Sequence, residues 1–276
     1  MNSQLSQEHI FSYLSHSAQR VVRLADQVEV FEELGSTQLY LKERLKADVS
    51  ITVPGASALV LAESQLAGKG RMDREWYASA GDNILMSCSW VYAKTPKDLA
   101  GLSLALVVSL AEYLKEAYGV FVSIKWPNDL LLCSKKLAGL LVDVETGSEC
   151  RIVVGLGLNV SQSLDALLID QAWTDLTQHV VGESLDRNKI VADIYSRWLE
   201  VLMSYPSLGF ESYQQRWNAL SEHKGKEVRL VKADISVEDE IQGVMQGVDR
   251  NGFLLICSDS EEVIVTDSSY SLRVVR

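Results

Sequence analysis

The chain has 276 residues, of which 47% are hydrophobic, enough to bury one large core and a small second one. Its 37 acidic residues outnumber its 26 basic ones, and the net charge of −11 disfavours non-specific binding to nucleic acid. The longest nearly uncharged apolar run, Leu102 to Ala111, is about half of a membrane span, and the polar N-terminal sequence does not look like a signal peptide. We therefore expect a water-soluble, cytoplasmic protein that binds neither DNA nor a membrane.

The cysteines and histidines form neither a disulfide framework nor a metal-binding pattern. The four cysteines are scattered without a C-x-x-C pair, and the four histidines show no H-E-x-x-H spacing. We expect reduced, mostly buried cysteines and no metal site held by protein side chains.

Helical and strand-like segments alternate along roughly the first 220 residues, which predicts a mixed α/β (α+β) architecture. Ser36 is placed to cap a helix over Thr37–Ala47, and Thr95 and Pro96 are placed to open a long helix that ends at Gly119. Strands are predicted over 28–34, 58–63, 84–92, 121–126, 136–145 and 151–159, and helical spacing recurs over 5–25, 188–205 and 210–220. The short connections between the last three strands predict a mixed, largely antiparallel sheet packed by helices.

The pattern changes near Ser221–Gly225. Short strand-like segments follow at 228–231, 241–248, 252–257, 262–266 and 270–275, and Asp249–Gly252 is the clearest turn between them. Five strands in about 50 residues predict a small β-barrel. We expect a catalytic domain over 1–222 and a second domain over 223–276.

A basic, glycine-containing loop follows the strand predicted over 58–63. It reads Gly68-Lys69-Gly70-Arg71-Met72-Asp73-Arg74-Glu75-Trp76. The two glycines allow close approach of the backbone to a ligand, and the cations concentrate positive charge, as a carboxylate beside a phosphate requires. Taken alone, such a segment is more often a solvated basic turn. It is not a P-loop, because the sequence contains no G-x-x-x-x-G-K-[ST].

A second polar segment, residues 125–129, reads K-W-P-N-D and ends a predicted strand. Pro127 forces a turn, so Asn128 and Asp129 are expected at the bend, and Lys136 begins the next strand. A lysine held at the level of a sheet can bridge a substrate carboxylate and an α-phosphate, and can stabilise charge in the transition state. Taken alone, the segment also fits an ordinary hairpin with an exposed lysine.

The order and spacing of five segments resemble the biotin protein ligase family: G-S-T at 35–37, G-K-G-R-x-x-R-x-W at 68–76, K-W-P-N-D at 125–129, K-L-A-G at 136–139 and G-L-G-L-N at 155–159. The resemblance covers about residues 28–276, including the C-terminal β-domain, which is SH3-like in that family. It implies an enzyme that activates biotin with ATP and Mg²⁺ to biotinyl-5′-AMP. The biotinyl group is then transferred to a lysine of a biotin carboxyl carrier protein, and a homodimer is a possible assembly.

The resemblance also assigns roles to the residues that match. Biotin contacts fall on Ser36, Thr37, Gln38, Gln65, Gly68, Lys69, Gly70, Arg71, Lys136 and Gly139. ATP or adenylate contacts fall on Arg71, Arg74, Trp76, Asn128, Asp129, Lys136, Asn159 and Trp173. Lys136 and Arg71 are the expected catalytic groups, and the loop over 161–172 is expected to order over the nucleotide. This chain departs from the family pattern at Gln38 (usually Asn), Lys69 (usually Arg) and Asp73 (usually Gly).

Two other functions fit part of the pattern. A lipoate or octanoate ligase would share the catalytic fold, but K-W-P-N-D together with the C-terminal β-domain favours biotin. A non-catalytic biotin-sensing regulator would carry an N-terminal DNA-binding domain. About 28 residues precede the first catalytic strand and contain no basic recognition helix, so we expect the monofunctional form.

Overall fold

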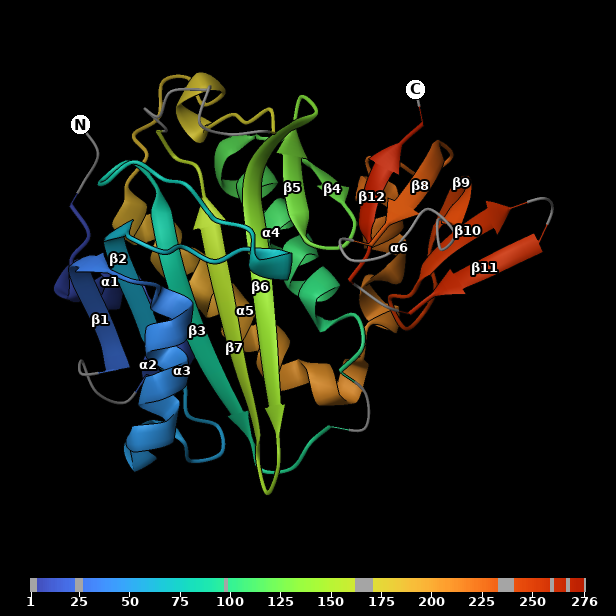
Figure 1. Cartoon of the computed structure of the whole chain (residues 1–276). Helices are drawn as coiled ribbons and strands as arrows, with labels where there is room; N and C mark the ends of the chain where they lie inside the picture. The colour runs from blue at the N-terminus through green and yellow to red at the C-terminus, as the bar shows by residue number, and fades with distance from the viewer. Residues whose placement is uncertain are drawn as a thin grey trace.

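The computed structural model describes residues 4–22, 27–96, 99–161, 171–232, 241–258, 261–266 and 269–275. In these ranges the chain forms a seven-stranded mixed sheet with helices on both faces and a five-stranded antiparallel sheet near the C-terminus (Figure 1). The mixed α/β class is confirmed, and the second sheet agrees with the small β-domain expected from the sequence.

The first sheet has the strand order β1-β2-β3-β7-β6-β5-β4. Its strands are β1 (Val28–Leu34), β2 (Leu59–Gln65), β3 (Ile84–Tyr92), β4 (Ser123–Lys125), β5 (Asp129–Leu132), β6 (Lys135–Thr146) and β7 (Cys150–Leu158). β1 pairs parallel with β2, and the remaining neighbours pair antiparallel. This arrangement confirms the predicted mixed, largely antiparallel sheet.

Helices cover the two faces of this sheet unequally. They are α1 (Gln7–Tyr13), α2 (His16–Val21), α3 (Thr37–Ala47), α4 (Leu102–Tyr118), α5 (Arg187–Leu208) and α6 (Glu211–Leu220), with 3-10 turns η2 (Val49–Ile51), η3 (Arg71–Asp73) and η5 (Leu176–Gln178). The large core lies on the face covered by α4 and α5, and α3 packs on the opposite face (Figure 1). Among the helices of the described ranges, none is both long and apolar enough to cross a membrane.

The start of α3 follows the sequence pattern. The Ser36 hydroxyl accepts a hydrogen bond from the Leu39 amide at 3.5 Å, so the predicted N-cap is confirmed. Leu41 and Leu45 are buried against Val60 of β2 and Val153 of β7. This packing fixes the N-terminus of α3 above the middle of the sheet.

The start of α4 is not where the sequence predicted it. The helix begins at Leu102 and not at Pro96, and its N-cap is Gly101 in the left-handed conformation, with φ of 73°. A Cβ at Gly101 would lie 2.6 Å from the Phe210 ring and 2.9 Å from the Asn251 carbonyl oxygen. Tertiary packing therefore sets this helix end, and it overrides the local capping signal at Thr95. The predicted end at Gly119 is confirmed.

The segment after Trp126 also differs from the prediction. Asp129 is the first residue of a strand, β5, and does not lie at the bend, which covers residues 126–128 and contains the cis Trp126–Pro127 peptide bond. Asp129 pairs with Lys125 of β4 on one side and with Gly139 of β6 on the other. A four-residue strand between two turns is too short to show a periodic pattern in the sequence.

The second sheet has the order β11-β10-β9-β8-β12. Its strands are β8 (Glu227–Val231), β9 (Ile241–Val248), β10 (Leu254–Ser258), β11 (Glu261–Val265) and β12 (Ser271–Val274). The Gly252 amide donates to the Asp249 carbonyl oxygen at 3.1 Å, which confirms the predicted turn. Each of the five strands predicted after Gly225 has a counterpart in this sheet.

Candidate functional site

A cavity of about 530 Å³ lies on the face of the first sheet that carries α3. Its floor includes Ser87 of β3, Gly139 of β6 and Gly155 and Gly157 of β7, and its walls include the start of α3 and the loop after β2. Gly155 and Gly157 share the face of Val153, because alternate residues of a strand point to the same side. The volume and concave shape suit a small-molecule ligand.

The cavity brings together nearly all the residues that the sequence singled out. They are Ser36, Thr37, Gln38, Gln65, Lys69, Gly70, Arg71, Arg74, Trp76, Asn128, Asp129, Lys136, Gly139, Asn159 and Trp173. Gly68 does not line the cavity; it is buried, and a Cβ there would lie 2.6 Å from the Trp76 carbonyl oxygen. Of the loop expected to cover the nucleotide, residues 162–170 lie outside the described residues.

The glycine loop (residues 68–76) folds back on itself as a small hairpin. The Gly70 amide donates to the Arg74 carbonyl at 2.7 Å, and the Trp76 amide donates to the Gly68 carbonyl at 3.0 Å. The Lys69 side chain is exposed, whereas Arg71 is half-buried and lines the cavity. The loop is drawn in teal in Figure 1, where it crosses in front of β7 and β6. It therefore covers the cavity floor.

Trp76, the last residue of the glycine loop, lies directly on the floor. Its ring occupies the space that a Cβ at Gly157 would need, and a Cβ at Gly139 would lie 3.1 Å from the same ring. The Lys136 ammonium lies 5.1 Å from the ring centroid, within the range of a cation–π contact. Because the indole nitrogen is buried without a hydrogen-bond partner among the described residues, the ring is held by packing.

Lys136 is held from several sides. Its Nζ forms an ion pair with Asp129 at 2.9 Å, and both side chains keep some exposure, 22% and 17%. The Lys136 amide donates to the Ala172 carbonyl at 2.8 Å, and the Thr174 amide donates to the Lys136 carbonyl at 3.0 Å, so Trp173 forms an isolated parallel bridge with Lys136. The ammonium is therefore fixed beside the cavity while it can still reach a ligand.

More cations gather around Lys136. Arg71 donates to the side-chain oxygen of Asn128 at 3.4 Å. Burial lowers the pKa of Lys125, and the nearby charges of Arg273, Lys136 and Arg74 lower it further, against an opposing effect of Asp129. This region of the cavity is thus positively charged, as the binding of a carboxylate and a phosphate requires.

One of these cations was missed by the sequence analysis. Arg273 lies on β12 of the second sheet and lines the cavity, and Arg74 of the glycine loop donates to the Ser271 hydroxyl of the same strand at 2.8 Å. Arg273 is an exposed residue next to buried Leu272 in a short strand, and such a position in the sequence gives no signal of a site residue. Only the fold brings it near Lys136.

The part of the cavity nearest Gly155 is polar and uncharged. The Thr37 amide donates to the Gln65 side-chain oxygen at 2.7 Å, and the Thr37 and Ser87 hydroxyls lie 2.9 Å apart. Ser87, which the sequence did not single out, donates to the Gln38 side-chain oxygen at 3.1 Å. The cavity therefore has polar, uncharged side chains near Gly155, whereas the Lys136 side chain lies further along, beside Gly139 and Trp76.

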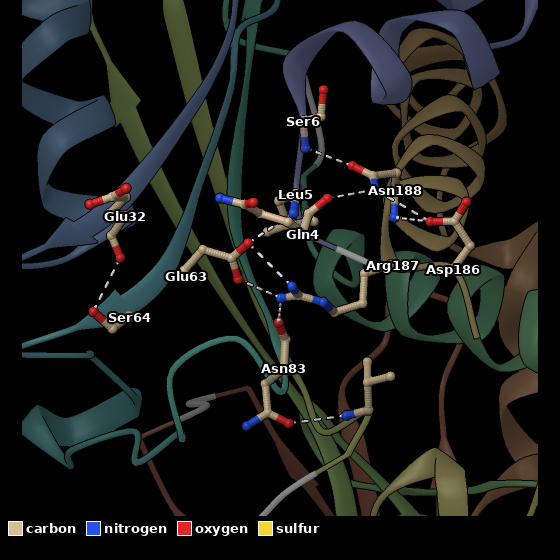
Figure 2. Close-up of polar contacts among 11 residues, drawn as sticks. Gln4, Leu5, Ser6, Glu32, Glu63, Ser64, Asn83, Asp186, Arg187 and Asn188 are labelled. Carbon is tan, nitrogen blue, oxygen red and sulfur yellow. Dashed lines mark hydrogen bonds and ion pairs between the residues drawn. The ribbon is translucent and has the colours of Figure 1, made fainter. Parts of the chain in front are cut away.

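A buried arginine ties together the strand ends that carry these residues (Figure 2). Arg187 is 1% exposed; it forms an ion pair with Glu63 at 2.6 Å and donates to the Asn83 carbonyl at 3.1 Å. The Asn83 side-chain oxygen accepts from the Val160 amide at 3.0 Å, and the Leu5 amide donates to Glu63 at 2.8 Å. The end of β2, the start of β3 and the end of β7 are thereby held in one position beside the cavity.

Comparison with known proteins agrees with the geometry of the cavity. The Biotin/lipoate A/B protein ligase family matches residues 31–159. The bifunctional ligase/repressor BirA of Salmonella typhimurium is 34% identical over 235 residues, which cover 84% of this chain and 70% of that protein. The biotin–[acetyl-CoA-carboxylase] ligase of Paracoccus denitrificans is 30% identical over 72% of this chain and 84% of its own length.

Solved structures give the same result. A biotin protein ligase from Aquifex aeolicus, in complex with biotin and ATP, superposes with a TM-score of 0.74 at 26% identity, covering 90% of this chain and 99% of that one. The two relatives, at 34% and 30% identity, are matched over 70% and 84% of their own length. The chain belongs to the Biotin/lipoate A/B protein ligase family and, within it, to the biotin protein ligases.

Proposed function

We propose that this protein is a biotin protein ligase that forms biotinyl-5′-AMP from biotin and ATP and transfers the biotinyl group to a lysine of a biotin carboxyl carrier protein. The observation that carries the proposal is the division of the cavity into a polar, uncharged end near Gly155 and a cationic end near Lys136. Biotin is a molecule with the same division, because it has a cyclic urea at one end and a carboxylate at the other.

The polar end suits the biotin ring. Thr37, Gln38, Gln65 and Ser87 supply hydrogen-bonding groups there, and the absence of a side chain at Gly155 leaves room for the Gln38 side-chain oxygen. The glycine loop would close over the ligand. Lys69 is exposed, so its contribution would come mainly from charge and from the backbone of the loop.

The cationic end suits the chemistry of adenylate formation. An oxygen of the biotin carboxylate attacks the α-phosphorus of ATP, the bond to the β-phosphate breaks, and pyrophosphate leaves. Two anions approach each other in this step, so positive charge and positioning matter more than a nucleophilic side chain. Lys136 and Arg71 would neutralise the carboxylate and the α-phosphate, and Arg74 and Arg273, which line the same cavity, would bind the remaining phosphates.

Mg²⁺ would enter with ATP. In the described part of the chain, no group of three or more His, Cys, Asp or Glu side chains could hold a metal ion, and the Asp129 carboxylate is paired with Lys136. The ion would therefore rest on phosphate oxygens and water, where it offsets phosphate charge.

The second step transfers the biotinyl group to the carrier protein. The neutral amine of the acceptor lysine attacks the carbonyl carbon of the mixed anhydride, AMP leaves with the electron pair of the broken C–O bond, and the amine loses a proton. Trp76 and Trp173 line the cavity on the side of Lys136 and would shield the adenylate from water. We also place the domain boundary at 222/223, so that Arg273 reaches the catalytic domain from the second one.

Incubation with ATP and biotin, followed by mass spectrometry, tests the proposal. We expect biotinyl-5′-AMP and an equal amount of pyrophosphate, and biotinylation of an added biotin carboxyl carrier domain. Lipoate in place of biotin should give no adenylate. Adenylation of lipoate at a similar rate, or no adenylate from biotin, would contradict the proposed function.

A further inference from the structure

Gln38 is fixed at the polar end of the cavity by four neighbours. It is 5% exposed at the start of α3, and its side-chain oxygen lies 2.5 Å from the position that a Cβ at Gly155 would take. Its amide nitrogen lies 3.3 Å from Asp143 Oδ2 and 3.3 Å from the Val153 carbonyl oxygen. Both neighbours of the nitrogen are hydrogen-bond acceptors, so only the NH₂ end of the amide can face them. The carbonyl end must then face Ser87.

This orientation fixes the direction of the adjoining hydrogen bonds. The Gln38 oxygen can only accept, so Ser87 uses its single proton to donate to it, at 3.1 Å. The Thr37 hydroxyl has one proton, which it donates either to the Gln65 side-chain oxygen at 3.1 Å or to Ser87 at 2.9 Å. The Gln65 oxygen is satisfied by the Thr37 backbone amide at 2.7 Å. The oxygens of Gln38, Ser87 and Thr37 are therefore left with lone pairs and no protons to offer to a ligand.

Asp143 sets the direction of this chain from outside the cavity. It lies on β6, does not line the cavity, and its Oδ2 also accepts from Lys42 at 3.0 Å. Lys42 is four residues after Gln38, so both side chains project from one face of α3 toward the same carboxylate oxygen. The ion pair with Lys42 holds the Asp143 carboxylate beside the Gln38 amide.

We propose that Asp143, held by Lys42, is a positioning residue that makes the ring end of the cavity an acceptor site and thereby selects a ring that carries N–H donors. The inference rests on the proposed function and extends it to selectivity. A cyclic urea supplies two N–H groups to such a surface. A dithiolane ring has none, so it leaves these oxygens unsatisfied when it displaces water, which is costly.

The first test removes the carboxylate. Asp143→Leu should weaken biotin binding about tenfold in titration calorimetry. Desthiobiotin, which keeps the urea but lacks the sulfur ring, should lose the same factor, and ATP binding should change less than twofold. Glu43→Gln, in the exposed Lys46–Glu43 pair on the same helix, is the matched control and should bind biotin as the wild type does.

The second test exchanges the roles of the two residues. Gln38→Glu places two carboxylates at hydrogen-bonding distance and should weaken biotin binding more than tenfold. Combining it with Asp143→Asn supplies an amide donor to the new carboxylate, which accepts from Ser87 in both variants, and should recover part of the lost affinity, since only the Val153 carbonyl oxygen then opposes the carboxylate. Such a rescue is not expected if Asp143 merely attaches α3 to β6. The double variant also keeps the inference testable if Asp143→Leu does not fold.

The results separate the inference from the proposed function. If wild-type protein does not bind biotin, both are overturned. If wild-type protein binds biotin while folded Asp143→Leu binds it equally well, or loses ATP affinity to the same extent, only the role of Asp143 is overturned. A double variant no better than Gln38→Glu alone would likewise overturn it.

Discussion

Trp76 and Gly157 share one position on the cavity floor: the indole ring lies in the space that a β-carbon of residue 157 would occupy. Gly157→Ala should therefore displace the glycine loop that carries Trp76 and Arg71. We expect at least a tenfold loss in the rate of adenylate formation, because misplacement by about 1 Å can cost as much as 10²-fold. Gly147→Ala, in the β6–β7 turn, is the control, since its nearest neighbour is at 3.9 Å. Unchanged activity of Gly157→Ala would contradict the arrangement.

Lys136→Ala should abolish most adenylate formation while the protein stays folded. The ammonium is the cation held beside the cavity by Asp129, and loss of one preorganised contact typically costs about 10²–10³ in rate. Pyrophosphate release measures the effect. The exposed neighbour Lys135, changed to alanine, should leave the rate as it is. A folded Lys136→Ala variant with near wild-type release would exclude the catalytic role.

Lys69→Arg should change biotin affinity less than threefold. The side chain is exposed, and the hydrogen bonds that hold the loop come from the backbone of Gly68 and Gly70. Lys69→Ala should act mainly by removing charge, so the difference should shrink at high salt. Titration calorimetry at two salt concentrations is the measurement. A tenfold gain for Lys69→Arg would mean that a bidentate contact forms in the complex.

Trp173→Ala should weaken the nucleotide step more than biotin capture. Trp173 lines the cavity, is only half-buried, and pairs through its backbone with Lys136. If the ring stacks on adenine, its loss is worth about 1–3 kcal/mol. Separate titrations with ATP and biotin measure the split. Equal losses for both ligands, with a lower melting temperature, would show a packing role instead.

His223 should make the folded protein sensitive to acid. Burial lowers its pKa from 6.5 to about 4, and the charges of Lys226 and Lys125 act in the same direction against Glu222. The unfolded chain binds the proton first, so the stability that neutral His223 allows is fully present above pH 6.5 and is lost as pH falls to about 4, on the order of 2–3 kcal/mol.

Urea unfolding of wild-type and His223→Gln protein between pH 7 and pH 4 isolates this contribution from that of the carboxylates, which both share. The wild type should lose more stability than the variant across this window. The same substitution at exposed His9 controls for the loss of a histidine. Parallel curves for wild type and His223→Gln would contradict the expectation.

Local patterns predicted much of the fold and most of the cavity. Strands β3 and β9 have the predicted bounds, β3 because it is a run of β-forming residues, and the Ser36 cap lies where its spacing placed it. The glycine loop and Lys136 could be recognised because their residue types carry the chemistry themselves. Such features are local in the sequence and need no knowledge of the packing around them.

The remainder depends on contacts between distant segments. Ser87 looks like an ordinary residue of a buried strand until the fold places it between Thr37 and Gln38. Arg273 reaches the cavity only because the second sheet lies beside the glycine loop. The N-cap of α4 is Gly101 and not Thr95, because the close packing of Gly101 against Phe210, a distant residue, sets the start of the helix.

The ion pair between Arg187 and Glu63 joins residues 124 positions apart in the chain. During synthesis from the N-terminus, the strands of the cavity floor emerge well before the helix that supplies Arg187. Until that helix docks, Glu63 and the Asn83 carbonyl lack the partner that holds β2 and β3 in place. The floor of the cavity therefore depends for its position on a helix that lies outside the cavity and is made more than a hundred residues later.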